Sequence, residues 1–439
     1  MPPEIDIATI DLAGLQSLPP RDAADGLLEL APPELASLFT RLGDESLAEV
    51  LAFLDPFDTA RLMTKLSRGQ AADVLEEMEP DDAADVMERF DPADQEAILH
   101  EMDPEAAEDV RALLVYPSDT AGGVMTSAYL RMYPDMTADQ ALRALRVLAE
   151  EAETIYYIYI TEPGTERLLG VLSLRNLVLA RPSQRVGDLI APETIKVRVN
   201  VDQEHAARLL GRHNLLALPV VDAEDRLVGI ITSDDAADIL QEEADEDIER
   251  LGGSQPLEEP YLSADPWRLY RSRIVWLLTL FVAAALTGNV LKFYERTLSE
   301  MVTLSFFIPM LIGTGGNTGS QIVTTLVRAM GTGEVSPSHA LRVVRKELMT
   351  AALLGITMAA ATYIGALFLG TTPELGRVVA VTALCIVLWS ALVAAVLPLA
   401  LSKLRLDPAV VSAPLITTLV DGTGLMIYFT AAQWLLHLD

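Results

Sequence analysis

The C-terminal part of the chain contains five long apolar segments, and these constrain the fold more than any other feature. They run near 272–294, 302–330, 347–370, 377–402 and 408–437. A helix needs about 20 apolar residues to cross the hydrocarbon core of a bilayer. We therefore predict an all-α transmembrane domain of five helices over 272–439. Gly and Pro interrupt the second and fifth segments, which predicts broken spans there.

The rest of the chain has the opposite character. Residues 1–267 carry 55 acidic and 20 basic side chains, a net charge of −35, whereas residues 268–439 carry 8 and 12. An acidic soluble part is therefore joined to a membrane part. A nucleic-acid partner is not expected, because phosphates require a basic surface. The five histidines lack metal-ligand spacing and Cys385 is the single cysteine, which argues against a zinc site or a disulfide framework.

Basic residues divide unevenly between the two ends of the apolar segments. Three lie at one set of ends: Lys292, Arg296 and Arg377. Nine lie at the other ends, on the same predicted side of the membrane as the acidic part: Arg268, Arg271, Arg273, Arg328, Arg342, Arg345, Lys346, Lys403 and Arg405. This bias predicts a multi-pass protein of the cell membrane with its N-terminus in the cytoplasm and its C-terminus outside. The opening sequence MPPEIDIATI has no signal-peptide pattern, which agrees.

A twelve-residue repeat is visible within residues 1–116, for example in EPDDAADVMERF and DPADQEAILHEM. Apolar residues at positions five, eight, nine and twelve of each unit have helical spacing. Acid–proline pairs begin several units and predict an N-cap followed by proline in the first turn. We predict an α-helical superhelical repeat domain. Asp81 and Asp85 near one helix start are candidates for a cation site, or serve as capping and solvated charges.

Residues 117–250 contain one β-α pattern twice. LLGVLSLRNLVL in the first copy parallels LVGIITSDDAADIL in the second. This pattern resembles a tandem pair of CBS domains, an α/β module. The resemblance implies sensing of a small ligand, often an adenine nucleotide such as ATP, through a contact at Thr232 with Asp235. Ser173 and Asn176 hold these places in the first copy, and simple helix capping by Thr232 explains the match equally well.

Acidic residues crowd the end of the second copy. Asp235, Asp238 and Glu242 share one helix face, and like charges at this spacing destabilise a helix unless counter-ions are present. The pattern predicts a divalent-cation site, with a solvated charged helix as the alternative. Residues 251–271 are then predicted to connect to the membrane and to include a plug helix.

Two of the apolar segments carry polar motifs. PMLIGTGGNTGSQ contains Gly316, Asn317 and Gln321, and DPAVVSAPLITTLVDGTG contains Thr418 and Asp421. A carboxylate in mid-span normally faces a cavity or a partner, and no base lies at comparable depth. The segments therefore predict a cation pathway. Asp407, where the second motif begins, forms the mouth of this pathway or caps the helix.

The order of repeats, tandem CBS pair and five spans with these two motifs closely resembles the MgtE family of bacterial magnesium channels or transporters. The resemblance implies a homodimer in the inner membrane, with a pore on its two-fold axis. It implies a pore lined by Gly316, Asn317, Gln321 and Thr418. It also implies an Mg²⁺ site at Asp421 with the backbone carbonyl of Thr417.

The same resemblance implies that Mg²⁺ binding among the cytoplasmic domains closes the pore. The residues that it assigns to this role are acidic: Asp81, Asp85, Glu204, Asp235, Asp238, Glu246, Asp247 and Asp407. Two other functions remain open, an ion-coupled carrier for another divalent cation and a membrane-anchored CBS nucleotide sensor. An enzyme is not expected, because the sequence contains no nucleophile–base constellation and no phosphate-binding loop.

Overall fold

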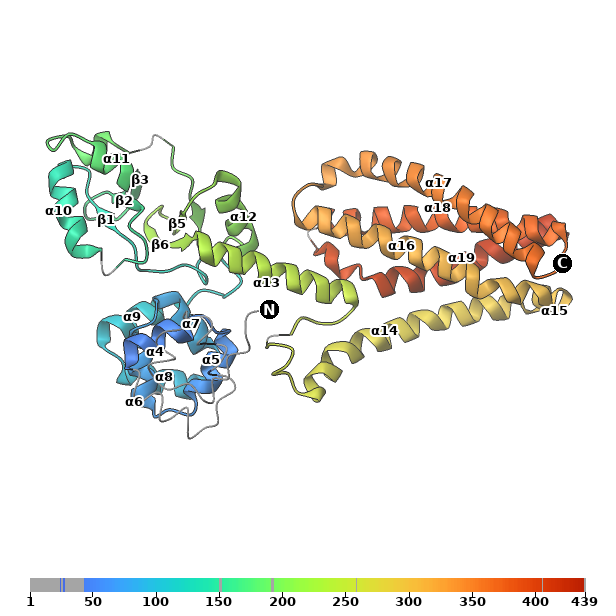
Figure 1. The fold of residues 1–439 in the computed structure, drawn as a ribbon, viewed down its shortest axis with the longest axis horizontal. Helices are drawn as coiled ribbons and strands as arrows, with labels where there is room; N and C mark the ends of the chain where they lie inside the picture. The colour runs from blue at the N-terminus through green and yellow to red at the C-terminus, as the bar shows by residue number, and fades with distance from the viewer. Residues whose placement is uncertain are drawn as a thin grey trace, which may run out of the picture. The chain divides into compact units, whose positions relative to one another are not determined.

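The computed structural model describes Ala24, Leu27 and residues 43–149, 152–190, 193–257, 259–404 and 406–437. Most of the first predicted repeats, before residue 43, and the C-terminal Asp439 lie outside these residues. The chain divides into two compact units (Figure 1). The first comprises residues 1–243 and 258–260, and the second comprises residues 244–257 and 261–439.

Short helices of the repeat form the N-terminal part of the first unit. They are α4 (Asp44–Leu51), α5 (Pro56–Met63), α6 (Arg68–Glu76), α7 (Pro80–Glu88), α8 (Pro92–Glu101) and α9 (Pro104–Leu113). Successive helices begin twelve residues apart, which confirms the repeat. Asp55 and Asp103 cap their helices by accepting backbone N–H bonds, whereas Glu79 and Asp91 precede the proline without such a bond. The apolar positions are buried and form a superhelix with one continuous core.

The CBS pair consists of two sheets with the same topology. The first contains β1 (Arg131–Met132), β2 (Tyr157–Thr161) and β3 (Leu168–Ser173), and the second contains β4 (Val197–Arg198), β5 (Ala217–Val221) and β6 (Leu227–Thr232). In each sheet the first strand pairs parallel to the middle strand, and the third pairs antiparallel. The accompanying helices are α10 (Ala138–Leu148), α11 (Leu174–Leu179), η2 (Val186–Asp188) and α12 (Gln203–His213). The predicted duplication is confirmed.

One long helix, α13 (Ser233–Gly252), follows the second sheet and continues into the second unit. It ends where Gly253 takes a φ of 80°, a left-handed conformation that glycine adopts without strain. The described residues between Gly252 and Pro266 contain no helix. The helical parts of the predicted connecting and plug region, 251–271, are therefore the end of α13 and the start of α14.

The second unit is built from long helices joined by short ones. The long helices are α14 (Pro266–Phe293), α16 (Ile308–Gly331), α17 (Ala340–Phe368), α18 (Pro373–Lys403) and α19 (Ala413–Leu436). The short ones are α15 (Glu295–Glu300), η3 (Val302–Phe307), η4 (Pro337–His339) and η5 (Pro408–Val410). Within the described residues, four helical spans are long and apolar enough to cross a membrane, namely α14, η4 with α17, α18 and α19. The Gly- and Thr-rich α16 is also 24 residues long.

Helix α18 packs against α16, α17 and α19, and α14 packs against α19 (Figure 1). The second predicted segment divides only near its start, where η3 gives way to α16 beside Pro309; the glycine motif does not break it, because α16 runs without interruption from Ile308 to Gly331. Gly315, Gly316 and Gly319 lie under side chains of α18 and α19 instead of opening the backbone. The fifth segment is interrupted only near its start, between η5 and α19.

Candidate cation sites

The first unit contains a cluster of carboxylates contributed by three separate segments. Glu79 and Asp81 lie at the start of α7, Glu153 precedes β2, and Asp234 and Asp235 begin α13. The local sequence explains four of these positions, because acidic residues favour the first turn of a helix, but not that of Glu153, which lies outside any helix. We call these five residues the acidic cluster.

The carboxylates of the acidic cluster lie close enough together to share a cation. One ligand oxygen from each of Glu79, Asp81 and Glu153 lies within 4.8 Å of the others, and the same holds for Glu153, Asp234 and Asp235. Asp81 exposes only 7% of its surface. Its Oδ1 atom and the Oε2 atom of Glu153 are buried without a hydrogen-bond partner. Buried polar atoms normally have a partner, so these two oxygens fit cation ligands.

Burial and mutual repulsion disfavour the charged forms of these acids. Desolvation is the larger cause and neighbouring carboxylates add to it, so the pKa of Asp81 lies well above its usual range. The same causes raise the pKa of Asp82 and Asp85 to about 7. They raise the pKa of Glu153 to about 8. A cation would remove this penalty by pairing with the ionised groups.

The sequence identified part of this arrangement. It predicted Asp81 and Asp235 as ligands, and the structure brings them together. Asp85 and Asp238 lie one helical turn further along α7 and α13, where Asp238 contributes to the repulsion that raises the pKa of Asp82. Glu79, Glu153 and Asp234 were missed. Glu79 resembled a simple helix cap, and nothing in the sequence around Glu153 indicated which segments it would meet.

Glu204, another predicted ligand, lies on α12 and pairs with Arg208 of the same helix. Thr232, the predicted nucleotide contact, donates its hydroxyl to Asp235 of the acidic cluster, and its backbone N–H also points to that carboxylate. Thr232 exposes 3% of its surface and lines no described cavity.

A cavity of about 260 Å³ lies instead between the two CBS copies. The equivalent residues of the first copy, Ser173 and Asn176, line it together with Tyr157, Val171 and Ile195. The cavity thus offers apolar walls with hydroxyl and amide groups and the Glu193 carboxylate, a mixed lining that suits a flat heterocyclic ligand with polar substituents.

In the second unit, a fixed cation already lies beside two predicted metal ligands. The Arg250 guanidinium pairs with Glu246 at 2.6 Å and with Asp407 at 2.8 Å. The pair with Glu246 lies within α13, and the pair with Asp407 joins α13 to the start of η5, directly before α19. Asp247 lies beside the end of α16, where a Cβ on Gly331 would stand 3.1 Å from its Oδ2 atom. Of these three predicted ligands, Glu246 and Asp407 hold an arginine.

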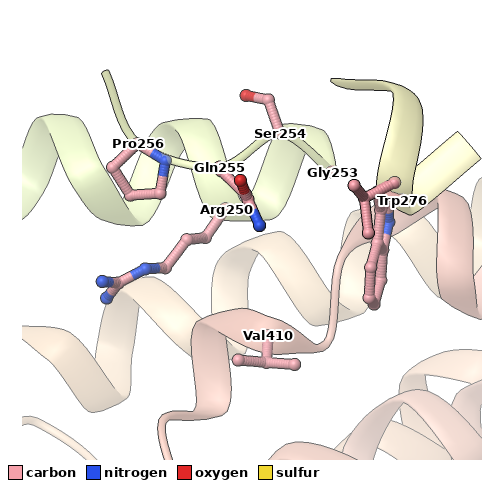
Figure 2. Close-up of a pocket in the computed structure, with 8 residues that line it drawn as sticks. Arg250, Gly253, Ser254, Gln255, Pro256, Trp276 and Val410 are labelled. Atoms are coloured by element: carbon pink, nitrogen blue, oxygen red, sulfur yellow. The ribbon is translucent and has the colours of Figure 1, made fainter. Parts of the chain in front are cut away.

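A cavity of about 240 Å³ lies next to Arg250 (Figure 2). Residues 253–256 form one wall, and Trp276 of α14 and Val410 of η5 form others. The Trp276 indole donates a hydrogen bond of 3.0 Å to the Ser412 hydroxyl at the start of α19. The segment that follows α13 therefore packs directly on the elements that begin the fifth span.

Helices α16 and α19 approach closely through the glycine motif. A Cβ on Gly316 would stand 2.9 Å from Thr417, and one on Gly319 would stand 2.5 Å from Ile416. Ser320 and Thr417 share a hydrogen bond of 3.2 Å. Gly316 is buried in this contact, so its predicted role as a pore-lining residue is wrong: the missing side chain admits Thr417 of the neighbouring helix.

A polar stripe runs along the exposed face of α16. Asn317, Gln321, Thr324 and Arg328 are exposed at helical spacing. In the described chain, neither Asn317 nor Gln321 has a side-chain hydrogen bond to protein. Polar side chains on a membrane helix face protein or water and not lipid. This stripe therefore faces an aqueous path or another subunit.

The Asp421 carboxylate lies in the middle of α19, and its Oδ1 atom is buried without a hydrogen-bond partner. Thr418 lies one turn earlier, and its hydroxyl donates to the carbonyl of Pro414. Thr417, whose carbonyl is the predicted second ligand, lies within the continuous α19 helix and contacts α16. The two predicted polar motifs are thus adjacent, with Asp421 the strongest candidate cation ligand among them.

Comparisons with known families match three parts of the chain. Residues 308–431 match the MgtE family, described as divalent cation transporters. Residues 18–119 match the MgtE intracellular N domain, and residues 186–242 match the CBS domain.

Two curated relatives cover most of the chain. The magnesium transporter MgtE of Thermus thermophilus is 43% identical over 328 residues, which are 75% of this chain and 72% of that protein. The magnesium transporter MgtE of Bacillus subtilis is 35% identical over 332 residues, with the same coverage. Among solved structures, the cytosolic domain of the Mg²⁺ channel MgtE in complex with ATP is 39% identical. It has a TM-score of 0.50 and covers 52% of this chain and 93% of that chain.

Proposed function

Because the chain belongs to the MgtE family of divalent cation transporters, we propose that its helical unit carries Mg²⁺ across a membrane past Asp421. The observation that supports this most directly is the buried, unpartnered Oδ1 atom of that carboxylate in a membrane helix. Such a group is costly in lipid and is normally retained for a cation or proton path. Transport needs no catalytic residue, and none is proposed.

The polar stripe of α16 and the adjoining face of α19 are proposed to form the wall of this path. Asn317, Gln321 and Thr418 provide oxygen and amide groups, and no soft ligand occurs beside them. Mg²⁺ loses its water reluctantly and prefers oxygen ligands in octahedral geometry. One carboxylate per subunit with polar neighbours suits an ion that keeps much of its hydration shell.

A homodimer accounts for the exposure of this stripe. Each copy leaves polar residues of α16 uncovered, and a second copy related by a two-fold axis would place two stripes and two Asp421 carboxylates around one path. The proposed orientation places the acidic first unit in the cytoplasm, as the distribution of basic residues indicates.

The acidic cluster is proposed to sense intracellular Mg²⁺ and to close the path when it binds. Asp81 and Glu153 offer buried, unpartnered oxygens from different segments of the first unit. Without a cation, their mutual repulsion favours separation of α7 from α13. A ligand shifts such an equilibrium by its differential affinity for the two states, so Mg²⁺ would favour the compact one.

The cavity lined by Ser173 and Asn176 is proposed to bind an adenine nucleotide. Its position between the CBS copies and its mixed apolar and polar lining support this assignment, as does the solved relative in complex with ATP. Ser173 and Asn176 are proposed as the nucleotide's contacts in this cavity, which Thr232 does not line.

Flux of Mg²⁺ into liposomes that contain the purified full chain tests the transport proposal. We expect Asp421→Asn to abolish flux while the oligomeric state and helical content stay unchanged. Glu295→Gln, at the exposed start of α15, is the matched control and should transport normally. Wild-type flux through a correctly folded Asp421→Asn protein would reject Asp421 as the pore site. Protease is added either outside the vesicles or within them. The side from which it cleaves the first unit reports the orientation of the protein.

A further inference from the structure

The first turns of α17 carry three basic side chains within five residues. Arg342, Arg345 and Lys346 are all exposed, whereas Val343 and Val344 between them pack on the core cluster of Leu326, Ala395 and Leu399. The helix is therefore oriented so that its apolar residues face the unit and its bases face outward. At 100° per residue, the three bases fall within about one-third of the helix circumference.

The electrostatics of this helix start are unfavourable without an anion. Like charges three and four residues apart repel one another, and basic groups in the first turns oppose the helix dipole. In the part of the chain that the structure describes, Arg342, Arg345 and Lys346 form no ion pair. The acidic residue of this stretch, Glu347, is half-buried on another side of the helix.

An apolar stripe continues along the same face of α17. Met349, Leu353 and Ile356 expose 63%, 70% and 61% of their surfaces. The opposite face carries small residues that pack on α18, where a Cβ on Gly355 would stand 2.6 Å from Leu384. In a membrane protein, the exposed stripe is the surface that meets lipid chains, and the three bases lie at its end.

We propose that Arg342, Arg345 and Lys346 form a binding site for the phosphate of an acidic phospholipid. Its acyl chains would lie along Met349, Leu353 and Ile356. Guanidinium and ammonium groups pair strongly with phosphate oxygens, and an anion there relieves both the mutual repulsion and the opposition to the dipole. The site is separate from the proposed ion path, since it lies on α17 and not on α16 or α19.

The general enrichment of basic residues at cytoplasmic helix ends accounts for bases in this connection, but not for their alignment above one lipid-facing stripe. The acidic part of the chain is another source of negative charge. The phospholipid is favoured because the same face is apolar for several turns beyond the bases, as a lipid requires and an acidic protein surface does not.

Native mass spectrometry of the full-length protein in an uncharged detergent tests the site with two lipids of equal acyl chains, phosphatidylglycerol and phosphatidylcholine. One base near an anionic lipid surface favours binding by about fivefold. We therefore expect wild type to prefer phosphatidylglycerol by at least about fivefold, and the variant Arg342→Gln/Arg345→Gln/Lys346→Gln to lose this preference. Free glycerol phosphate should not displace the lipid, because it lacks the chains that the stripe holds.

A control variant, Lys292→Gln/Arg296→Gln/Arg377→Gln, removes the same charge from the opposite helix ends and should keep the preference. Size-exclusion profiles and Mg²⁺ flux establish that both variants are folded. An undiminished preference in the α17 variant would overturn the proposal. So would displacement by glycerol phosphate, or binding that appears only after the acidic first unit has been cleaved off, which would assign that unit to the basic face.

Discussion

Replacing Glu153 with glutamine removes one charge from the middle of the acidic cluster, and we expect it to stabilise the cation-free first unit. The Glu153 carboxylate lies within 4.8 Å of ligand oxygens on both α7 and α13. Burial is the main cause that raises its pKa from 4.5 to about 8, and repulsion from Asp235 and Glu79 adds to it. Ionised Glu153 therefore opposes the contact between the two helices.

The pH dependence follows from the direction of this shift. The folded unit keeps the Glu153 proton over a pH range in which the unfolded chain has lost it, so the stability of the cation-free unit falls as the pH rises from about 4.5 to about 8. Solvent reaches this half-buried side chain and weakens the effect of its ionisation. The resulting loss in the free energy of unfolding is about 2–3 kcal/mol. This corresponds to roughly a 30- to 150-fold change in the opening equilibrium.

Hydrogen–deuterium exchange of the full-length protein, measured in peptides that cover α7, reports this opening equilibrium. With EDTA at about pH 8, Glu153→Gln should slow exchange by about 30-fold or more, and at about pH 5 it should have little effect. Excess Mg²⁺ should protect wild type more than the variant. Glu101→Gln alters an exposed glutamate of α8 outside the cluster and should change neither result.

Two outcomes would refute the reasoning. If Glu153→Gln had the same effect at both pH values, ionisation of Glu153 would not be the source of the strain. If Mg²⁺ protected variant and wild type equally, Glu153 would not belong to the cation site, and the buried oxygens would have only a structural role.

Three further predictions concern the second unit. Gly315→Ala should lower the thermal stability of the solubilised protein by about 1–3 kcal/mol, because the new Cβ would stand 2.6 Å from Ile386; Gly313→Ala, with no atom within 4 Å of the new Cβ, should be neutral. Arg250→Gln removes two partly exposed ion pairs worth together about 1 kcal/mol. With EDTA it should speed hydrogen exchange at the end of α13 by about fivefold, and Mg²⁺ should reverse this. Asn317→Leu should slow Mg²⁺ flux severalfold in a folded protein, whereas Thr357→Leu on the exposed face of α17 should not, and equal flux in both would remove the polar stripe from the ion path.

Features of the chain were predictable where interactions between residues close in sequence determine them. The repeat helices begin twelve residues apart because local start signals recur in most units, for example a capping aspartate followed by a first-turn proline at Asp55–Pro56 and Asp103–Pro104. The CBS copies were recognisable because each strand and helix recurs in the same order. These signals need no knowledge of distant contacts.

The acidic cluster was only half predictable, because its geometry depends on contacts between remote segments. Glu79, Glu153 and Asp234 were not distinguished by the sequence, and only folding brings Glu153 close to the other two. The same limit explains the error at Gly316. A glycine motif in a membrane segment is compatible with an opened backbone or with close packing, and only the position of Thr417 shows that packing is the reason.

The acids around Arg250 and those of the acidic cluster differ in what neutralises them. This difference indicates which contact depends on Mg²⁺. Glu246 and Asp407 hold Arg250, a cation that the chain itself supplies and that no chelator removes. Among the described contacts, Asp81 and Glu153 have no comparable base, and burial together with neighbouring acids raises the pKa of Asp81. Removal of divalent cations should therefore loosen the contact between α7 and α13 more than the contact between α13 and η5. Arg250 thus holds the contact at the proposed mouth whether or not Mg²⁺ is present. The contact at the acidic cluster is the one that depends on Mg²⁺.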